Sequence, residues 1–316
     1  YCGVCHSDLT NAACHLPGAP SYPMVPGHEV VGVCTRVGAG VSKFKVGDHV
    51  GVGNIVDSCL ECHSCLDDKE QWCAKMVPTY NGKDWSGRAA SGGGVSYTLG
   101  GYSTAMVVHE RFCITVPKGY PLEHVGPVMC AGTTMYDPLR EAGVTAGTRL
   151  GIIGLGGLGV MGIKLGKALG CTVTVISRGE AKRDLAIRSG ADIYIASADE
   201  SQMAAHAGSL DLILNTIPSN HDASPFLDLL IAEGGKHVHV GLHASSIAAG
   251  ASNYLLPGRS RERMTFIGGV QTTQEVMDLC ARDDIRTEID IRPVGELNRI
   301  FEALDSSNES GKRFVL

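Results

Sequence analysis

The sequence contains no long uncharged apolar stretch and no excess of basic residues. No run of about 18 apolar residues free of charge occurs, so we expect nothing to span a membrane. No basic and then apolar stretch opens the chain, which favours a cytoplasmic protein. Lys and Arg total 27 against 33 Asp and Glu, giving a net charge of −6. Without a basic stripe, a nucleic-acid partner is not expected.

The chain has 316 residues, of which 41 are glycine and 12 are cysteine. This length suits two domains better than one, because single hydrophobic cores stop growing at roughly 250–300 residues. Glycine stands well above its usual share of about 7%, which indicates many tight turns and close backbone approaches. Disulfides are not favoured in a chain without an export signal, so the cysteines need another explanation.

The character of the sequence changes at about residue 130. Before it, short runs such as Val30–Val33 and His49–Val52 alternate with turn dipeptides and predict an irregular, mostly β domain. After it, apolar runs alternate with amphipathic stretches, which is typical of βαβ units in an α/β domain with a parallel sheet. The predicted strands there are Arg149–Ile153, Thr172–Ile176, Ile193–Ile195, Leu210–Leu214, His237–Val240 and Arg263–Ile267. The predicted helices are Gly159–Leu169, Ala181–Ser189, Ser224–Ala232, Thr273–Ala281 and Gly295–Ala303.

Four cysteines lie within fifteen residues of one another in a polar segment of the first domain. They are Cys59, Cys62, Cys65 and Cys73, with the spacing Cys-x-x-Cys-x-x-Cys-x7-Cys. One short lobe with this spacing can wrap a tetrahedral Zn²⁺ with Zn–S bonds of about 2.3 Å. The alternatives are disulfides or four buried thiols. Because four thiolates would leave no open position, we predict a structural zinc that holds the lobe together and takes no part in chemistry.

A glycine motif follows the first predicted strand of the second domain. The stretch after Ile153 has the pattern Gly-x-Gly-x-x-Gly and precedes a predicted helix. In this strand–loop–helix context, the glycines let the backbone approach a pyrophosphate at the start of the helix. We therefore predict a dinucleotide-binding loop. Its residues are Gly154, Leu155, Gly156, Gly157, Leu158 and Gly159.

The end of the second predicted strand indicates which dinucleotide is bound. A site for NAD would place an acid there to bind the ribose hydroxyls, yet no acid occurs between Gly159 and Glu180. The residues present are Ser177 and Arg178, with Lys182 further on. A hydroxyl, a guanidinium and an ammonium group would bind a 2′-phosphate, which a carboxylate would repel. NADP(H) is the predicted cofactor; the alternative is ordinary exposed charge at the start of a helix.

Cys5, His28 and Cys130 are far apart in the sequence, and no local rule joins them. Taken alone, Cys5 could pair with Cys2 in a redox-active Cys-x-x-Cys, His28 could be a turn histidine and Cys130 a small core residue. What changes this interpretation is the order in which their surrounding motifs occur along the chain.

In that order the chain resembles the zinc-dependent medium-chain dehydrogenase/reductases, and among them the cinnamyl alcohol dehydrogenase branch. The resemblance covers nearly the whole chain. The family has a further segment ahead of the first motif, so we expect the given sequence to lack part of its N-terminal domain. The matching motifs are Tyr1-Cys-Gly-Val-Cys-His-Ser-Asp8, Val25-Pro-Gly-His-Glu29, the lobe Cys59–Cys73, Gly100-Gly-Tyr-Ser103, Cys130-Ala-Gly-Thr-Thr134, the glycine loop and Gly311-Lys-Arg-Phe-Val315.

The resemblance implies a catalytic zinc held by Cys5, His28 and Cys130, which gives two zinc ions per chain. Two thiolates and a neutral imidazole leave the fourth position open to water or substrate, with Glu29 beside it. Ser7 would hydrogen-bond the substrate oxygen and pass its proton toward the cofactor. The family often ends this relay with a histidine, where this chain has Thr10.

The resemblance also implies an architecture. It predicts a GroES-like, mostly β catalytic domain over residues 1–129, a Rossmann domain over 130–268 and a C-terminal segment, 269–316, that returns to the catalytic domain. It implies a homodimer formed through a sheet edge, for which Arg263–Ile267 is the candidate. The residues at positions where the family contacts the nicotinamide half are Thr134, Thr216, Val240 and Gly268.

The substrate is less well defined by the residues. Lignin-pathway enzymes of the branch commonly have a Trp five residues after the last cysteine of the lobe, where this chain has Pro78. The segment Asn81–Gly101 is longer than usual and contains Trp85, Arg88 and Gly92-Gly-Gly94. Trp85 could replace the missing aromatic wall or anchor the longer loop. We therefore expect a broad reductase of aldehydes instead of a dedicated monolignol enzyme.

Three functions compete at this point. The leading one is an NADP(H)- and zinc-dependent alcohol dehydrogenase that transfers hydride between nicotinamide and a primary alcohol or aldehyde. A second is a polyol dehydrogenase resembling mannitol dehydrogenase, which NAD preference and turnover of sugar alcohols would favour. The third is a non-enzymatic zinc-ribbon protein, which the net charge of −6 disfavours. The third would hold one zinc per chain, and the enzymes two.

Overall fold

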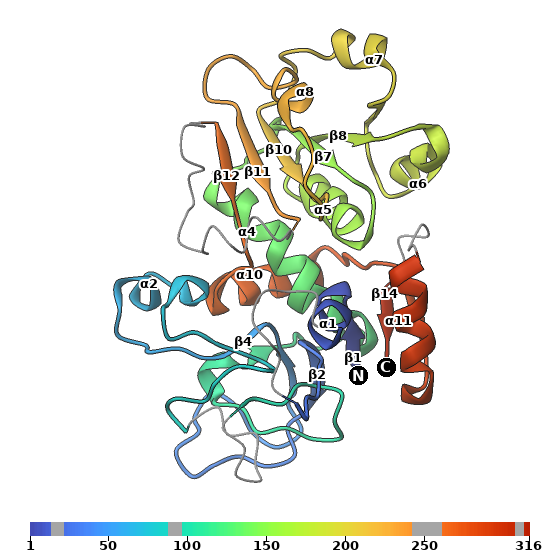
Figure 1. Cartoon of the computed structure of the whole chain (residues 1–316). Helices are drawn as coiled ribbons and strands as arrows, with labels where there is room; N and C mark the ends of the chain where they lie inside the picture. Colours follow the sequence, from blue (N-terminus) through green and yellow to red (C-terminus); the bar gives the residue numbers. More distant parts are fainter. Residues whose placement is uncertain (14–21, 88–96, 242–260, 307–312) are drawn as a thin grey trace. The chain divides into compact units, whose positions relative to one another are not determined.

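The computed structural model describes residues 1–13, 22–87, 97–241, 261–306 and 313–316 (Figure 1). The chain divides into two compact units. Unit 1 consists of residues 1–133 and 267–316, and unit 2 of residues 134–266. The chain therefore enters unit 1, leaves it for unit 2 and returns to unit 1 for its last fifty residues.

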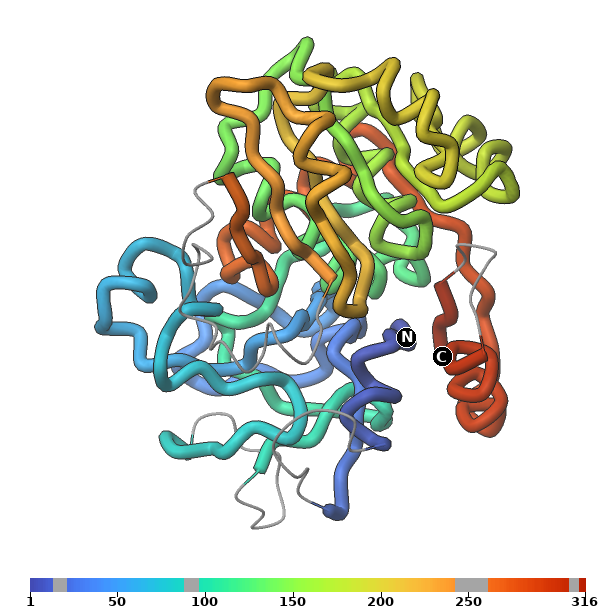
Figure 2. The backbone as a smooth tube through the Cα atoms, turned by 45° about the horizontal axis from the view of Figure 1, so that its top comes forward, coloured from blue at the N-terminus to red at the C-terminus, as the bar shows by residue number. Residues whose placement is uncertain are grey.

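Unit 1 contains a six-stranded sheet in the order β13-β14-β1-β2-β3-β6. Neighbouring strands are antiparallel from β14 to β6, and β13 pairs in parallel with β14. Strand β1 lies beside β14, which brings the first and last residues of the chain together (Figure 2). A separate antiparallel pair consists of β4, which precedes the four-cysteine lobe in the sequence, and β5, which follows it. The bounds are β1 Cys2–Val4, β2 Glu29–Val33, β3 His49–Val52, β4 Ile55–Asp57, β5 Val77–Pro78, β6 Ile114–Thr115, β13 Ile289–Ile291 and β14 Arg313–Val315.

The helices of unit 1 are short, except for two in its C-terminal part. Cys130 lies in the middle of a π-helical turn, η4, all of which is buried. Such turns are rare and often occur at functional sites. The bounds are α1 His6–Ala12, α2 His63–Leu66, η1 Glu70–Trp72, η2 Glu110–Phe112, η3 Leu122–His124, α3 Val125–Pro127, η4 Val128–Gly132, α10 Val270–Arg282, η6 Val294–Glu296 and α11 Leu297–Ser306.

Unit 2 contains a six-stranded parallel sheet in the order β12-β11-β10-β7-β8-β9. This is the strand order of the doubly wound dinucleotide-binding fold, in which the chain reverses direction across the sheet between its first and fourth strands. Here those strands are β7 and β10, so the glycine loop after β7 lies at the reversal point. The bounds are β7 Arg149–Ile153, β8 Thr172–Ser177, β9 Ile193–Ala196, β10 Leu212–Asn215, β11 Lys236–His239 and β12 Glu262–Met264.

Apolar strand residues make the core of unit 2, because a parallel sheet covered by helices buries both of its faces. The side chains of Ile153, Ile176 and Ile213 are at most 2% exposed and pack with Phe226 and Leu230. The helices between the strands are α4 Thr133–Glu141, α5 Gly157–Ala168, η5 Glu180–Lys182, α6 Arg183–Arg188, α7 Glu200–Ala205 and α8 Ser224–Leu227.

The predicted GroES-like and Rossmann fold is confirmed, with one clear error among the predicted helices. A helix was expected over Ser224–Ala232, but α8 ends at Leu227. The following residues pair with another segment instead: Leu210 donates its N–H to the Leu229 carbonyl and accepts from the Ile231 N–H. After a turn at residues 228–229, Leu230 therefore forms an isolated parallel bridge with Leu210 instead of continuing the helix.

Within the described residues, no helix combines the length and the apolar character that a membrane crossing requires.

Candidate active site and metal centres

The four cysteines of the lobe converge on one point. Their sulfur atoms all lie within 4.8 Å of one another. Cys59 Sγ is 3.8 Å from Cys65 Sγ and 3.5 Å from Cys73 Sγ. Cys62 Sγ is 3.6 Å from Cys65 Sγ. A tetrahedral zinc with 2.3 Å bonds would need sulfurs about 3.8 Å apart, so the four thiols fit this ion.

The backbone of the lobe donates hydrogen bonds to two of its sulfurs, whereas burial raises the pKa of Cys65 and of Cys73. The Cys62 N–H points at Cys59 Sγ at 3.3 Å, and the Lys75 N–H points at Cys73 Sγ at the same distance. Hydrogen bonds from the backbone N–H groups, with that of Glu61 foremost, lower the pKa of Cys59 to about 6. Because the ligand form of cysteine is the thiolate, these donors favour metal binding.

A second group of ligands forms from three distant parts of unit 1. Cys5 precedes α1, His28 precedes β2, and Cys130 lies in η4. Cys5 Sγ is 3.9 Å from Cys130 Sγ, and His28 Nε2 is 3.1 Å from Cys130 Sγ. The sulfur separation matches the edge of about 3.8 Å expected around a tetrahedral zinc. Three protein ligands with a neighbouring carboxylate are the composition of an open zinc site.

The pKa values of the two thiols of this group are shifted in opposite directions. Hydrogen bonding to Cys130 lowers the pKa of Cys5 well below its ordinary value, although burial opposes this. The same contact and burial raise the pKa of Cys130. Cys5 faces His28, whereas the thiol of Cys2 is buried in β1, and both cysteines are free thiols without a disulfide.

Asp8 fixes the imidazole of His28. Its Oδ1 atom lies 2.9 Å from His28 Nδ1, and its Oδ2 atom accepts hydrogen bonds from Tyr102 Oη at 2.8 Å and from the Cys5 N–H at 2.9 Å. Burial lowers the pKa of His28, but the Asp8 carboxylate outweighs it and raises the pKa well above its ordinary value. With Nδ1 directed at a carboxylate, the imidazole turns Nε2 toward the two thiols, as metal-binding histidines do.

Glu29 lies beside the same group and is fully buried. Arg313, which comes from β14 at the other end of the chain, donates a hydrogen bond to Glu29 Oε1. Burial raises the pKa of Glu29 to about 7, and the Arg313 guanidinium opposes this shift. A Cβ atom on Gly3 would overlap Glu29 Oε2, so glycine at that position makes room for the carboxylate.

The predicted proton relay lies along helix α1. Ser7 is half-buried in the first turn, and its carbonyl oxygen accepts hydrogen bonds from Asn11 Nδ2 at 2.9 Å and from Tyr80 Oη at 3.2 Å. Thr10 Oγ1 donates to the His6 carbonyl at 2.9 Å. The hydroxyl of Thr10 thus uses its proton within its own helix, and its lone pairs are left to accept another.

The glycine loop of unit 2 has the geometry that its motif predicts. Gly154 has φ of 87°, which favours glycine, and a Cβ on Gly159 would overlap the Gly154 carbonyl oxygen. Gly156 caps the twelve-residue helix α5, and a Cβ there would meet no atom within 4 Å. The first and third glycines therefore allow tight packing, while the second faces open space at the start of a helix, where a pyrophosphate fits.

The residues predicted to bind a 2′-phosphate follow the same loop. Ser177 ends β8, and Arg178 beside it is exposed. Lys182 Nζ donates to the Leu155 carbonyl at 3.0 Å, which places an ammonium group against the glycine loop. Ser177 thus ends the second strand, Arg178 follows it directly, and Lys182 lies in the short helix η5.

The residues expected near the nicotinamide lie in both units: Gly268 is in unit 1 and the other three are in unit 2. In unit 2, Thr134 is buried in α4, Thr216 Oγ1 donates to the Ile153 carbonyl at 2.8 Å, and the Val240 N–H donates to the Asn215 carbonyl at 2.8 Å. Thr216 and Val240 therefore sit at the carboxyl ends of neighbouring strands.

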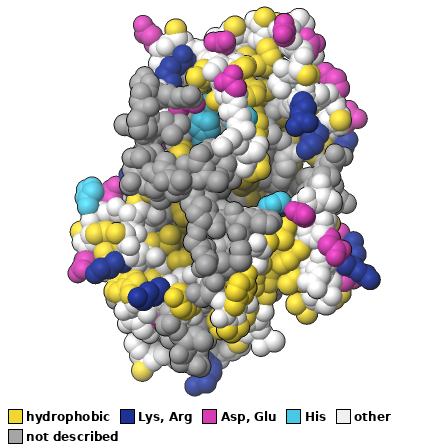
Figure 3. All heavy atoms as spheres, in the orientation of Figure 1, with side chains coloured by type: hydrophobic (Ala, Val, Ile, Leu, Met, Phe, Trp, Pro, Cys, Tyr) yellow, Lys and Arg dark blue, Asp and Glu magenta, His cyan; other side chains and the backbone are white. Residues whose placement is uncertain are grey.

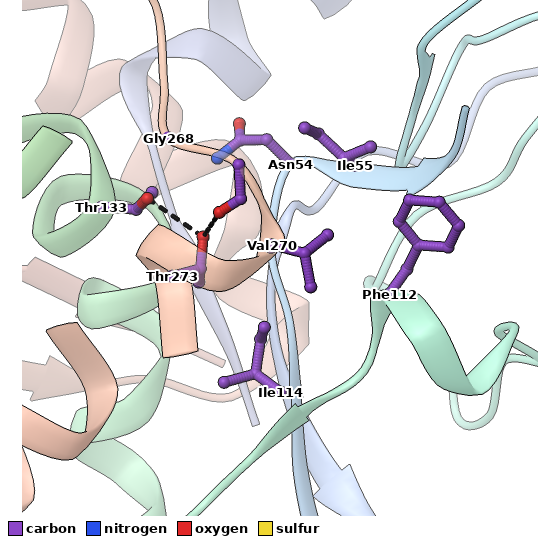
Figure 4. Close-up of a pocket in the computed structure, with 10 residues that line it drawn as sticks. Asn54, Ile55, Phe112, Ile114, Thr133, Gly268, Val270 and Thr273 are labelled. Carbon is purple, nitrogen blue, oxygen red and sulfur yellow. Dashed lines mark hydrogen bonds between the residues drawn. The ribbon is translucent and has the colours of Figure 1, made fainter. Parts of the chain in front are cut away.

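Gly268 lies in unit 1 at the edge of a small hollow (Figure 4). A Cβ on Gly268 would overlap Thr133 Oγ1, which itself lies 3.0 Å from Thr273 Oγ1. No predicted zinc ligand lines the hollow. Its lining residues are Gly53, Asn54, Ile55, Phe112, Ile114, Thr133, Gly268, Gly269, Val270 and Thr273.

Trp85 is held against the end of the cysteine lobe. Its indole Nε1 donates to the Lys75 carbonyl at 2.8 Å, and Lys75 Nζ lies 5.1 Å from the ring centroid. Such contacts are those of a loop anchor, the second of the two roles considered for this residue. Pro78 is in β5, paired with Ile55. Arg88 and Gly92-Gly-Gly94 lie outside the described residues, as do Gly311 and Lys312 of the last motif.

The sequence does not reveal which residues support the candidate ligands. Asp8, Tyr102 and Arg313 occur in the matching motifs, but nothing in the sequence indicates their supporting contacts. Asp8 could have been found, since an acid three residues after Cys5 is the pattern of a helix capping box, which the structure forms. Tyr102 and Arg313 had no such signal, because each reaches the site from a remote strand or loop.

Two family profiles match the chain. The alcohol dehydrogenase GroES-like domain matches residues 1–118, and the zinc-binding dehydrogenase matches residues 157–282. Among curated proteins, a probable cinnamyl alcohol dehydrogenase 2 of Picea abies is 42% identical over 318 residues, covering 100% of this chain and 86% of its own. Cinnamyl alcohol dehydrogenase 2 of Arabidopsis thaliana is 41% identical over 319 residues, covering 100% and 82%.

Solved structures agree with these matches. A cinnamyl alcohol dehydrogenase of Sorghum bicolor has a TM-score of 0.85 at 39% identity, covering 99% of this chain and 86% of its own. The enzyme of Helicobacter pylori, complexed with NADP(H), has a TM-score of 0.83 at 34% identity, covering 99% and 87%. The fold and the two cysteine-containing groups define a zinc-dependent medium-chain dehydrogenase. Within that class the chain belongs to the cinnamyl alcohol dehydrogenase family, as the sequence predicted.

Proposed function

We propose that the chain interconverts aldehydes and primary alcohols with NADP(H), using a zinc ion held by Cys5, His28 and Cys130. The observation that supports this most directly is the 3.9 Å separation of Cys5 Sγ and Cys130 Sγ. Cys5 and Cys130 are 125 positions apart in the sequence, and a shared metal ion accounts for the convergence of their thiols with the imidazole of His28. When bound, zinc supplies a Lewis acid for the oxygen of the substrate.

The chain's own residues keep this site ready for its ligand. Asp8 accepts from His28 Nδ1 and so fixes the tautomer that leaves Nε2 free to coordinate. Arg313 neutralises Glu29, which prevents an uncompensated carboxylate from lying beside the two thiols. Cys59, Cys62, Cys65 and Cys73 hold a second, structural zinc by the same proposal.

For proton transfer we assign Ser7 as the group that hydrogen-bonds the substrate oxygen. Ser7 lies two residues from Cys5 on the first turn of α1, and Asn11 and Tyr80 hold its backbone carbonyl. Thr10 occupies the end of the relay. Its hydroxyl donates to the His6 carbonyl, so to pass a proton on it would turn this O–H toward solvent and release it while a lone pair accepts the incoming proton.

The cofactor would lie on the glycine loop, Gly154–Gly159, with its 2′-phosphate near Ser177, Arg178 and Lys182. When bound, NADP(H) supplies or accepts the hydride. The open space at Gly156 and the ammonium of Lys182 against the loop support this placement. Thr134, Thr216, Val240 and Gly268 are the candidates for contacts to the nicotinamide half.

The decisive activity test is a panel of aldehydes reduced with NADPH and with NADH. We expect turnover of several unrelated aldehydes with NADPH, because Pro78 stands where an aryl-binding Trp would be and Trp85 is held against the lobe. Turnover confined to sugar alcohols with NAD would instead identify a mannitol-type dehydrogenase. Absence of any hydride transfer would contradict the proposed activity.

Arg178→Asp tests the cofactor assignment. The substitution should lower the preference for NADPH over NADH more than tenfold, because a charged hydrogen bond to phosphate is worth about 1.5–3 kcal/mol. The ratio of kcat/KM values for the two cofactors measures it. Arg188→Asp is the matched control, since Arg188 is exposed on α6 and changes the charge equally. An unchanged ratio in Arg178→Asp removes this residue from the site.

We also propose how the chain assembles. Strand β12 lies at the edge of the unit 2 sheet, where a second copy could continue the sheet and form a homodimer. The domain boundaries at residues 129 and 268 and a cytoplasmic location stay predictions.

A further inference from the structure

Three side chains of types that can bind a metal lie together in unit 2, separate from the two cysteine groups of unit 1. They are His237 and His239 of β11 and Glu262 of β12, and their ligand atoms lie within 4.8 Å of one another. The two histidines are two residues apart on one strand and therefore project from the same face of the sheet. Glu262 is the register partner of His237. Figure 3 shows histidine side chains at the surface of unit 2, whereas His237 itself is fully buried.

Both imidazoles turn a nitrogen toward the same carboxylate oxygen. His239 Nε2 is 3.0 Å from Glu262 Oε1, and His237 Nδ1 is 3.6 Å from that atom. Donor atoms on a tetrahedral ion with bonds of about 2.0–2.1 Å lie about 3.3 Å apart. The two measured separations lie on either side of this value, so an ion fits among the three groups with small side-chain movements.

His237 gives a second and independent sign of a missing ligand. Its side chain is fully buried, and its Nδ1 atom has no hydrogen-bond partner. A buried ring nitrogen without a partner is costly, and such atoms are rare in folded proteins. Burial, helped by neighbouring His239, lowers the pKa of His237 to about 3. The ring is therefore neutral at physiological pH, which is the form that binds metals.

From this geometry we propose that His237, His239 and Glu262 bind a divalent transition-metal ion such as Zn²⁺, which makes a third metal site in the chain. Two imidazoles and one carboxylate suit zinc, cobalt and nickel better than calcium or magnesium, which prefer oxygen ligands. The set contains no sulfur, which distinguishes it chemically from the two cysteine groups.

Coordination of a metal by His237 Nδ1 requires the His237 ring to change its tautomer. Asn215, which contacts the opposite ring nitrogen, determines how easily this change occurs. Asn215 Nδ2 lies 3.1 Å from His237 Nε2, an arrangement in which the ring carries its proton on Nδ1. If Nδ1 binds the metal, the proton moves to Nε2 and needs an acceptor. The amide of Asn215 must then turn its oxygen toward the ring, which loses the bond from the Ile217 N–H to that oxygen at 3.1 Å. A carboxylate at position 215 would accept from His237 Nε2 and from the Ile217 N–H at once, and His221, whose Nε2 lies 2.8 Å from Asn215 Nδ2, would then have to donate to it.

The test uses Co²⁺ as the probe on protein whose cysteine sites hold zinc. Bound cobalt and zinc are counted per chain after equilibrium dialysis, and the visible spectrum is recorded. We expect one cobalt per chain taken up without loss of zinc. Its d–d absorption should appear without the near-ultraviolet band that thiolate ligands produce, because no cysteine belongs to the site.

Variants of the cluster should change cobalt affinity in opposite directions. His239→Gln and Glu262→Gln should weaken it at least tenfold, whereas Asn215→Asp should tighten it about tenfold, the usual range for a partner behind a ligand. His239→Gln is the safer of the first two, since the His239 side chain is 11% exposed and Glu262 is wholly buried. His206→Gln, a partly exposed histidine at the end of α7, is the matched control and should leave binding unchanged.

Two results would overturn the proposal. One is a wild-type chain that binds cobalt only in exchange for zinc. The other is cobalt uptake that His239→Gln and Glu262→Gln leave as it was, which would assign the ion to surface histidines. If Glu262→Gln unfolds, His239→Gln still decides, with retained secondary structure checked by circular dichroism. The thermal midpoint gives a second readout, because an ion bound only to the folded state raises it in wild type and not in His239→Gln.

Discussion

The two cysteine groups of unit 1 fit the same ion but are built in opposite ways. The lobe would take all four ligands from residues 59–73, and Cys59 and Cys73 accept hydrogen bonds from the N–H groups of Cys62 and Lys75 in or next to that segment. The proposed catalytic group, Cys5, His28 and Cys130, would take its ligands from the start of α1, the turn before β2 and the π-helical turn η4. The lobe is thus a local structure, whereas the catalytic group exists only when the sheet of unit 1 has formed.

The support around each group differs in the same way. Backbone N–H groups support the lobe, with Ser58 Oγ, 3.3 Å from Cys65 Sγ, as its one described side-chain partner outside the cysteines. Side chains support the catalytic group: Asp8 and Tyr102 behind His28, and Arg313 behind Glu29. Backbone donors survive most substitutions, but side-chain partners can be removed one at a time. We therefore expect activity to be sensitive to residues that touch no zinc, and the lobe to be sensitive mainly to its own cysteines.

The largest expected effect is that of Cys130→Ala. Removal of one of three ligands should empty the catalytic site and lower aldehyde reduction by about 10³-fold or more, since a Lewis acid contributes several kcal/mol. One zinc per chain should be lost while the lobe zinc stays. Elemental analysis and kcat/KM measure the two effects, and circular dichroism controls for folding. Turnover at the wild-type rate would show that Cys130 is not a ligand.

Cys73→Ser should have the reverse profile. The lobe zinc should be lost, and the free energy of unfolding should fall by several kcal/mol, on the order of what a structural zinc contributes. The catalytic zinc should remain, and kcat per folded molecule should change little at a temperature where the variant is folded. Denaturant unfolding and metal analysis measure this. If Cys73→Ser keeps its stability, the lobe does not depend on metal.

The contrast between the groups also explains what the sequence could reveal. The lobe was predictable from spacing alone, because all of its ligands lie within fifteen residues. The glycine loop was predictable for the same reason, and the strands around it alternate regularly enough to locate β7 to β12 within a few residues. The end of α8 was not, because the pairing of Leu210 with Leu229 and Ile231 is a tertiary contact that no local pattern records.

The catalytic group could be proposed only through resemblance to a family. Nothing local joins Cys5, His28 and Cys130, and their meeting depends on β1 pairing with β2 and on the buried position of η4. Arg313 is a stronger example, since it reaches Glu29 across 284 positions of sequence. The cluster of His237, His239 and Glu262 lies between these cases: the two histidines alternate on one strand, but Glu262 joins them only through the register of the sheet.

Asp8→Asn gives the smallest of these effects and tests the contrast most sharply. The amide keeps the size of the carboxylate but removes its charge, so His28 loses the partner that fixes its tautomer. Zinc affinity at the catalytic site and kcat/KM should each fall about 10–100-fold, the range for partners of metal-binding histidines. The lobe zinc should be unaffected, because Asp8 hydrogen-bonds Cys5, Gly27, His28 and Tyr102, none of which belongs to the lobe. Competition with a chelator measures both affinities in one sample. Equal weakening of the two sites would mean that Asp8 acts through the stability of unit 1 as a whole, and the division between a backbone-supported and a side-chain-supported zinc would then be wrong.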